Sequence, residues 1–421
     1  MLVVTSNWCL SDGTLSAGPP RRLIDRFRAE VRRSSLRYGF RRDGSYRPVD
    51  AIDVVLAGDT FDWLVSREWT GKERPWDEGR KAAAALERVA VGSLQRGGRL
   101  LATLAAWMRR GIEVPAADRR GRPMQATLQR VPVRVAMLRG DRDRWLEQVA
   151  SGGTLWSQGP VVGTCWSDGD VTVRHGEELD PLYGACGRGP TLGESLAVDL
   201  IARFGRAIDD ITSLQPAAAG LLRRLAGGDL IDVPTRLVAW LTAHDRGGRL
   251  PAEARQELVD AWRRAVECWH RAARRLPPRG KDGVDLVGRL AEWLELGGGS
   301  AAGKVWQQSD FPSSPAIEHP SDDACAVVLG HLAADIGATT AWRRQVVCLG
   351  PRGLPARAGL EDDFLAPAVV VIRPGCEGRQ VDWLPTASVM RGAGGHNDDH
   401  EERGVWLSDV SRAGRRIVDA A

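Results

Sequence analysis

The chain is 421 residues long, enough to bury a large core and to form about two or three domains. Its hydrophobic fraction of 43% and charged fraction of 27% are those of an ordinary soluble globular protein. Basic residues exceed acidic ones by only 58 to 54, and this net charge of +4 is too small to indicate nucleic acid as a partner. The seven cysteines are scattered and contain no C-x-x-C pair, so neither a disulfide framework nor a zinc ribbon is indicated. The N-terminus lacks signal-peptide features and no apolar run reaches the roughly 18 residues of a membrane span, so we expect a cytoplasmic protein without a membrane segment.

Short apolar runs rich in β-branched residues recur along the chain, and each ends at a glycine or another polar turn residue. Longer segments with helical periodicity lie between them, such as residues 21–36 and 81–110. This alternation of strand and helix predicts an α/β protein built on a layered sheet. The expected strands are Leu2–Ser6, Val54–Ala57, Val133–Leu138, Val171–Arg174, Ala326–Leu329, Val346–Leu349, Ala368–Ile372 and Gln380–Leu384.

The middle of the chain has a different pattern, because residues 192–296 contain no convincing strand. Apolar residues recur there at helical spacing, for example Phe204 and Ile208, and predict an insertion of about two to four helices. The glycine-rich stretch 297–303 predicts a flexible hinge back to the sheet. Another segment, 115–130, is rich in arginine, proline and glycine and predicts a surface loop.

Polar residues follow five of the expected strands, at the positions where α/β proteins usually bind their ligands. In chain order, these turns are Ser6-Asn7-Trp8-Cys9-Leu10, Gly58-Asp59-Thr60-Phe61-Asp62, Arg139-Gly140-Asp141-Arg142-Asp143, His175-Gly176-Glu177 and Gly330-His331-Leu332-Ala333. Their order and spacing resemble the calcineurin-like metallophosphoesterases, whose motifs read D-x-H, G-D-x-x-D, G-N-H-D, H-G and G-H-x-H. The alternative is an unrelated α/β sheet that carries polar loop residues by chance.

The resemblance covers about residues 1–185 and 320–350. It is closest at Gly58–Leu64 for the second motif and at Arg174–Pro181 for the fourth. The helix start at Leu192–Ser195 is similar to relatives in the UDP-2,3-diacylglucosamine hydrolase branch.

The resemblance implies a four-layer αββα sandwich, with two mixed sheets packed face to face, helices outside them and a helical subdomain that overhangs the site. The implied domain organisation is a metallophosphoesterase-like domain in two parts, a helical insertion between them, and a β-rich C-terminal extension that completes the sheets. The two parts of the metallophosphoesterase-like domain are residues 1–190 and 301–350. The helical insertion is residues 191–300, and the C-terminal extension is residues 351–421.

Members of this family hold two divalent metal ions, and the resemblance assigns the bridging carboxylate to Asp59. The other first-metal positions of the family fall on Asn7, Cys9 and Ala333. A neutral amide is a poorer ligand than a carboxylate, a cysteine ligates only as a thiolate, and alanine has no ligand atom. The resemblance therefore implies that this half of the site is degenerate and empty.

The second-metal positions of the family fall on Asp59, Asp141, His175 and His331, with Asp141 in place of the asparagine of G-N-H-D. Two carboxylates and two imidazoles suit Zn²⁺, Mn²⁺ or Fe²⁺. The alternative is that these four side chains hydrogen-bond one another as the remnant of an ancestral site and hold no metal.

Arg142 replaces the histidine of G-N-H-D, which in the family assists the leaving group or the phosphate charge. Arginine cannot act as a general acid at neutral pH because its pKa exceeds about 12. It can still bind phosphate through two parallel hydrogen bonds, so we expect a phosphate contact there. Asp62 and Asp143 are expected to orient the loops and the ligands.

These replacements predict a degenerate phosphoesterase, closer to a pseudoenzyme than to a hydrolase. We expect a binding or scaffold subunit of a larger assembly, with a protein partner docked on the helical insertion or the C-terminal region. Two alternatives stay open: an active one-metal phosphoesterase that hydrolyses a phosphomonoester or phosphodiester, and a sensor that binds a phosphate-containing ligand without turnover.

Overall fold

The computed structural model describes a mixed α/β chain with a parallel sheet flanked by helices. All described residues belong to one unit, Met1–Thr386, and none lies in the second unit, Ala387–Ala421. Within the described residues, every helix is too short or too polar to span a bilayer. The described residues are 1–16, 18–151, 160–169, 171–180, 182–183, 189–211, 214, 221, 237–238, 240–242, 250–276, 287–288, 290–291, 294, 326–331, 345–348, 369–373 and 380–384.

The larger sheet has six strands in the order β14-β13-β1-β3-β7-β8. Its four strands from β1 to β8 are parallel, while β13 and β14 are antiparallel additions at the β1 edge. The strands are β1 (Leu2–Thr5), β3 (Ile52–Ala57), β7 (Val133–Leu138), β8 (Val161–Gly163), β13 (Val369–Arg373) and β14 (Gln380–Leu384).

The smaller sheet has four strands in the order β12-β11-β10-β9, and only β9 is antiparallel to its neighbour. Its strands are β9 (Cys165–Asp168), β10 (Val171–Arg174), β11 (Ala326–Leu329) and β12 (Gln345–Cys348). All eight strands expected from the sequence are therefore confirmed, each within two residues of its expected ends. A buried cluster joins the two sheets, since it includes Val4 and Val55 of the larger sheet and Val173 of the smaller one.

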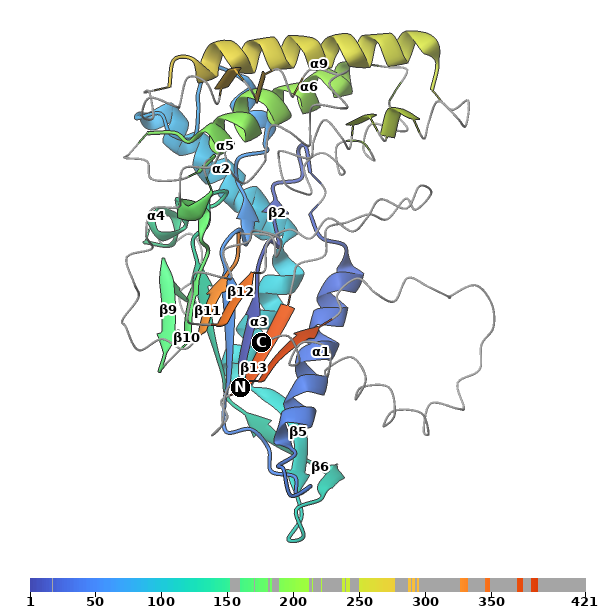
Figure 1. Cartoon of the computed structure of the whole chain (residues 1–421), viewed down its shortest axis with the longest axis vertical. Helices are drawn as coiled ribbons and strands as arrows, with labels where there is room; N and C mark the ends of the chain where they lie inside the picture. The colour runs from blue at the N-terminus through green and yellow to red at the C-terminus, as the bar shows by residue number, and fades with distance from the viewer. Residues whose placement is uncertain are drawn as a thin grey trace. The chain divides into compact units, whose positions relative to one another are not determined.

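Helices cover the other face of the larger sheet (Figure 1). A second hydrophobic cluster lies between this face and the helices. Alternate strand residues such as Val3 and Val54 belong to it, because successive side chains of a strand point to opposite faces of the sheet. They pack with Phe27 of α1 (Arg21–Gly39) and Leu104 of α3 (Gly98–Arg110).

The helical periodicity predicted over residues 81–110 is confirmed, and it is divided between two helices. The first, α2 (Arg80–Arg96), ends at Gly97, whose backbone N–H bonds the Ser93 carbonyl, and α3 then begins at Gly98. Two consecutive glycines are poor helix formers, and they interrupt a periodicity that otherwise continues.

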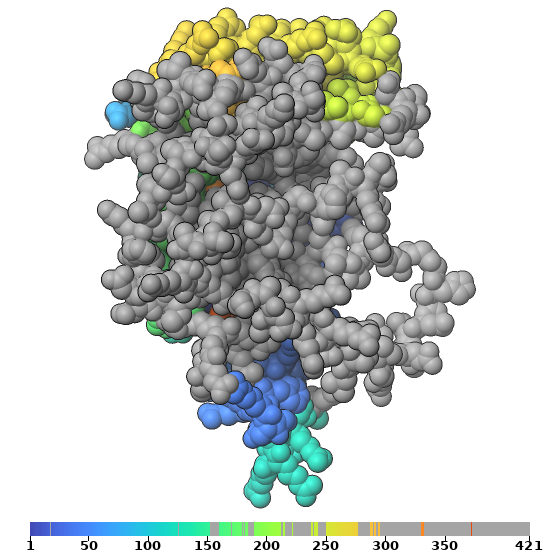
Figure 2. Space-filling model, in the orientation of Figure 1, coloured from blue at the N-terminus to red at the C-terminus, as the bar shows by residue number. Residues whose placement is uncertain are grey.

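The surface loop expected over residues 115–130 is also wrong. This segment forms an antiparallel hairpin of β5 (Ile112–Ala117) and β6 (Pro123–Val131). The Asp118 carboxylate closes its turn by accepting the backbone N–H groups of Arg120 and Arg122, each at 2.8 Å. Figure 2 shows this hairpin at the surface, where Leu128 is 46% exposed. The arginine and glycine content that predicted a loop belongs to the turn and to the solvent-facing residues.

Within residues 191–300 the described elements are all helical. A capping box starts the first helix, because the Thr191 hydroxyl accepts the N–H of Glu194 and the Glu194 carboxylate accepts the N–H of Thr191. Phe204 packs edge to face against Trp262 with ring centroids 5.0 Å apart, and α9 lies along α6 (Figure 1). The domain boundaries stay a prediction, and the hinge at 297–303 lies outside the described residues. The elements are α5 (Leu192–Ser195), the π-helix η3 (Leu196–Ala202), α6 (Arg203–Asp210) and α9 (Ala252–Ala273).

Short elements complete the described chain. They are β2 (Leu10–Ser11), β4 (Phe61–Asp62), η1 (Arg67–Thr70), α4 (Leu146–Ser151) and η2 (Glu177–Leu179), and β2 pairs with β4 in a sheet of its own.

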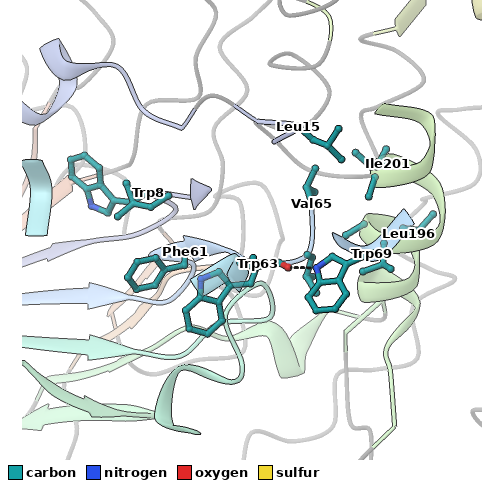
Figure 3. Packing of buried hydrophobic residues seen from close by; sticks show 14 of the residues in the cluster. Trp8, Leu15, Phe61, Trp63, Val65, Trp69, Leu196 and Ile201 are labelled. Atoms are coloured by element: carbon teal, nitrogen blue, oxygen red, sulfur yellow. Dashed lines mark hydrogen bonds between the residues drawn. The ribbon is translucent and has the colours of Figure 1, made fainter. Parts of the chain in front are cut away.

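Buried tryptophans connect the loop after β4 to the helical segment. Trp69 is fully buried in η1, and its indole N–H donates to the Trp63 carbonyl at 2.6 Å (Figure 3). In Figure 3 the same ring lies near Leu196 of η3, while Ile201 of η3 lies beside Leu15. The hydrogen bond satisfies a carbonyl that has no access to water, so it fixes how this loop packs on η3.

We expect Trp69→Phe to lower the free energy of unfolding by about 1–3 kcal/mol, because it leaves the buried Trp63 carbonyl without its donor. Urea denaturation followed by circular dichroism measures this change. Trp269→Phe is the matched control, since Trp269 is equally buried and the described residues offer its indole N–H no acceptor. Equal losses in the two variants would contradict the role of the Trp69 hydrogen bond.

Candidate metal centre

Four side chains from four different turns meet at the carboxyl ends of the two sheets. Asp59 follows β3, Asp141 follows β7, His175 follows β10 and His331 follows β11. One ligand atom from each lies within 4.8 Å of every other. The structure thus brings together the four residues that the sequence predicted as second-metal ligands, and the cluster could hold a metal ion.

The backbone around Asp59 adopts conformations that most residues avoid. Gly58 has φ +89° and Asp59 itself has φ +49°, in the left-handed region. Asn7 and Cys9, in the adjoining loop after β1, also have positive φ values of 59° and 46°. Non-glycine residues in this region cost free energy and are typical of sites that fix side chains for function.

Asp141 is the central carboxylate of the cluster. Its Oδ1 lies 2.9 Å from His175 Nε2 and 3.1 Å from His331 Nδ1. The Asp59 Oδ1 lies 3.4 Å from the same His175 Nε2. The other Asp141 oxygen, Oδ2, is buried and has no hydrogen-bond partner among the described residues.

Each histidine is held from outside the cluster by its other ring nitrogen. His175 Nδ1 donates to the Ala57 carbonyl at 2.8 Å, and His331 Nε2 donates to Asp180 Oδ2 at 2.8 Å. Metal-bound histidines are usually held in this way, by a carbonyl or a carboxylate on the far nitrogen. In the neutral tautomers set by these bonds, both inner nitrogens would point lone pairs at carboxylate oxygens. A positive charge must therefore lie among them, either as protons on the rings or as a cation.

The pKa values of the cluster also show that its carboxylates favour a positive charge on the histidines. Burial lowers the pKa of His175, but Asp59 and the bond to Asp141 outweigh it and raise that pKa to about 10. Burial likewise opposes protonation of His331, yet Asp141 and Asp180 hold its pKa well above the usual value. Burial and the charge of Asp141 raise the pKa of Asp59 to about 6. Against the effect of burial, the two histidines keep the pKa of Asp141 well below its usual value.

Two charge-balanced states fit this geometry. In one, both rings are imidazolium ions, and in the other both are neutral and a dication lies between them and the carboxylates. The donor set of two carboxylates and two imidazoles suits Zn²⁺, Mn²⁺ or Fe²⁺. The unpartnered Asp141 Oδ2 is the observation that favours the dication, because imidazolium protons leave this oxygen unsatisfied.

The positions predicted to be degenerate lie beside Asp59. The Cys9 N–H donates to the Asp59 carbonyl at 2.9 Å, and the Asn7 side-chain amide donates to the Gly330 carbonyl at 3.0 Å. Burial raises the pKa of the Cys9 thiol well above its usual value in the absence of a metal ion. The third position, Ala333, lies outside the described residues.

Arg142 is turned into the protein, towards carboxylates. Its Nη1 donates to Asp62 Oδ2 at 3.0 Å, and its Nε lies 3.7 Å from Asp59 Oδ2. Its side chain is only 8% exposed. The phosphate contact predicted for this residue would have to compete with both carboxylates.

Asp62 and Asp143 hold the turns around the cluster. Asp143 accepts the N–H of Gly140 at 2.7 Å and that of Phe61 at 3.0 Å, which joins the turn after β7 to the turn after β3. Asp62 accepts the N–H groups of Leu64 and Val65. Burial and the charge of Asp59 raise the pKa of Asp143 to about 7.

The sequence did not predict the residues that hold His331. Asp180 lies within the stretch Arg174–Pro181 that resembles the fourth motif, five positions after His175, but the motif gives it no role. The Tyr183 ring packs edge to face on His331 with centroids 4.9 Å apart. The only sequence signal was proximity to the motif, because the partner of these residues lies about 150 positions further along the chain.

Comparison of the chain with protein-family models, with curated proteins and with solved structures found no match. The family resemblance therefore remains an interpretation of the motifs. The α/β fold and the buried Asp/His cluster stand independently of it, since both are properties of the structure.

We expect Gly140→Ala to distort the cluster. An added Cβ would lie 2.6 Å from the backbone nitrogen of Asp59 and 2.8 Å from His175 Nε2, and the backbone atom cannot move aside cheaply. Urea denaturation should show a loss of about 1–3 kcal/mol in the free energy of unfolding. Gly98→Ala is the control, because nothing lies within 4 Å of its added Cβ, and it should be neutral or slightly stabilising. A Gly140→Ala protein as stable as wild type would show that the turns are not packed this tightly.

Proposed function

We propose that this chain is a degenerate calcineurin-like phosphoesterase that binds a single divalent metal ion and does not hydrolyse phosphate esters. The order of the five motifs supports the family assignment, and the hydrophobic cluster shared by the two sheets is compatible with a four-layer αββα sandwich. The observation that carries the metal proposal is the buried Asp141 Oδ2, which has no hydrogen-bond partner among the described residues and lies beside the inner nitrogens of His175 and His331.

In this proposal Asp59, Asp141, His175 Nε2 and His331 Nδ1 hold the ion, which is Zn²⁺, Mn²⁺ or Fe²⁺. When bound, such an ion would polarise a phosphate oxygen or lower the pKa of a water molecule. The His331 side chain is 13% exposed, whereas those of the other three are at most 3% exposed, so a ligand would approach from the His331 side.

Three features support a loss of hydrolysis. Two-metal phosphoesterases clamp the attacking and leaving oxygens between two ions, and the first-metal positions here offer an amide at Asn7 and a thiol at Cys9 in place of a carboxylate and an imidazole. Arg142, at the position of the G-N-H-D histidine, cannot donate a proton to a leaving group at neutral pH. Its guanidinium is also committed to Asp62 and Asp59.

A binding or scaffold role within a larger assembly is part of the proposal. The tryptophans at 240, 262 and 269 do not supply the docking surface, because all three are buried in the core. A partner surface on the helical insertion would therefore consist of other residues. The second docking region predicted from the sequence, residues 351–421, is described only at β13 and β14.

We expect purified protein incubated with Mn²⁺ or Zn²⁺ and then desalted to retain about one ion per chain, measured by plasma mass spectrometry. His175→Ala should retain far less, because it removes a ligand that faces both Asp59 and Asp141. His270→Ala is the matched control, since it removes a histidine of α9 that is outside the cluster. Excess metal should also raise the unfolding temperature of wild type and of His270→Ala but not of His175→Ala. Wild-type protein that retains no ion would overturn the metal site and favour the hydrogen-bonded remnant.

We expect no turnover of bis-p-nitrophenyl phosphate or p-nitrophenyl phosphate by the metal-loaded protein above the rate of His175→Ala. The reason is that the chain offers neither a second ion nor a proton donor at the Arg142 position. Metal-dependent turnover that disappears in His175→Ala would overturn the pseudoenzyme proposal in favour of a one-metal phosphoesterase. Saturable binding of phosphate esters without turnover would favour the sensor.

A further inference from the structure

The two carboxylate oxygens of Asp59 face two different side chains, His175 and Arg142. Oδ1 lies 3.4 Å from His175 Nε2 and accepts the Arg142 backbone N–H at 3.0 Å. Oδ2 lies 3.7 Å from the Arg142 Nε on the other side. A carboxylate that bridges two cations is arranged in the same way, with one oxygen for each.

The Arg142 guanidinium lies in an acidic, nearly dry environment. The side chains of Arg142, Asp59 and Asp62 are 8%, 3% and 1% exposed. The Arg142 Nη1 donates to Asp62 Oδ2 at 3.0 Å, and its Nε lies 3.7 Å from Asp59 Oδ2, the Asp59 oxygen that does not face His175. The guanidinium therefore lies on the side of Asp59 away from the cluster ligands.

Without a cation, this side of Asp59 would hold two buried carboxylates next to each other. Isolated buried charges are strongly destabilising unless they are paired. Asp62 Oδ2 faces the Arg142 side chain, because it accepts the hydrogen bond that Arg142 Nη1 donates. One fixed positive charge balances Asp62 here, and it contributes to the compensation of Asp59, whose other oxygen faces the histidine half of the cluster.

We propose that the Arg142 guanidinium is a built-in cation that replaces a second metal ion, and that it limits the centre to one ion by occupying the side of Asp59 that faces Asp62. This inference rests on the proposed metal site at Asp59, Asp141, His175 and His331. It assigns Arg142 a role in metal stoichiometry and in positioning Asp59, not in binding phosphate.

The test is the number of Mn²⁺ ions bound per chain by Arg142→Ala, measured by equilibrium dialysis with metal analysis. Removal of the guanidinium leaves Asp59, Asp62 and the space between them open to a cation. We expect the stoichiometry to rise from one ion to two at high Mn²⁺ concentration, while Arg142→Lys stays at one. Two Mn²⁺ ions that share Asp59 should also give an exchange-coupled electron paramagnetic resonance signal that one ion cannot give.

The double variant Arg142→Ala/Asp62→Asn is the matched control. It removes the guanidinium together with the carboxylate that it balances, so it should fold without the uncompensated charge and bind only one ion. If Arg142→Ala alone is unstable, the inference expects Mn²⁺ to raise its unfolding temperature by more than it raises that of the double variant.

The outcomes separate the two proposals. No bound ion in wild type overturns the metal site and this inference with it. One ion in wild type and still only one in a folded Arg142→Ala protein overturns the inference and leaves the metal site standing. An Arg142→Ala protein that Mn²⁺ stabilises no better than the double variant also overturns it.

Discussion

Burial of carboxylates at the ends of two sheets requires positive charge within a few ångströms, and this constraint organises the centre. Asp59, Asp62, Asp141 and Asp143 are all buried there. An unpaired charge in such a place would cost several kcal/mol, a large part of the stability of a typical domain. Compensation comes from three directions: the two histidines, the guanidinium of Arg142, and backbone N–H groups such as those that Asp143 accepts. The motif residues are therefore coupled, since removal of one positive group leaves several buried carboxylates without a compensating charge.

The two sheets are joined at this point by hydrogen bonds from side chains to backbone carbonyls as well as by charge. The Ser6 hydroxyl, after β1, lies within bonding distance of the Ala57 carbonyl, at 3.3 Å, and of the Gly330 carbonyl of the smaller sheet, at 2.9 Å. Within the smaller sheet, the N–H groups of Gly330 and His331 bond the carbonyls of Arg174 and His175 at 3.0 and 2.7 Å and extend the pairing of β10 with β11. A side chain at 330 would overlap the Ala57 carbonyl, so glycine is needed for the turns to approach this closely. Packing of the sheets and geometry of the cluster are thus one constraint.

The sequence predicted those features of the fold and site that depend on local pattern. Apolar runs closed by glycine predicted the strands, and the rule that ligands gather at their carboxyl ends indicated the turns to compare. The resemblance of those turns to the phosphoesterase motifs then predicted Asp59, Asp141, His175 and His331. Local pattern gave a wrong prediction for the β5–β6 hairpin. Its exposed polar residues have the composition of a loop, although the backbone forms two paired strands. Local pattern also could not predict the partners of a long side chain. Whether Arg142 turns outward to a phosphate or inward to Asp62 depends on contacts about 80 positions apart in sequence, which no local periodicity encodes.

A guanidinium and a metal ion balance the same carboxylates with different consequences, and this difference connects stability to the proposed loss of hydrolysis. The charge of arginine is permanent at physiological pH and does not depend on metal supply, so it compensates Asp62 and the facing oxygen of Asp59 whether or not metal is bound. It has no open coordination position, however, and cannot lower the pKa of a bound water molecule as a metal ion does. In the proposed centre, with one cation built in, the packed turns and the remaining metal ligands are kept while the second ion of a two-metal mechanism is given up. The charge that stabilises the turns and the charge that would activate water are then separable, which is why the proposal joins an intact cluster to a lost reaction.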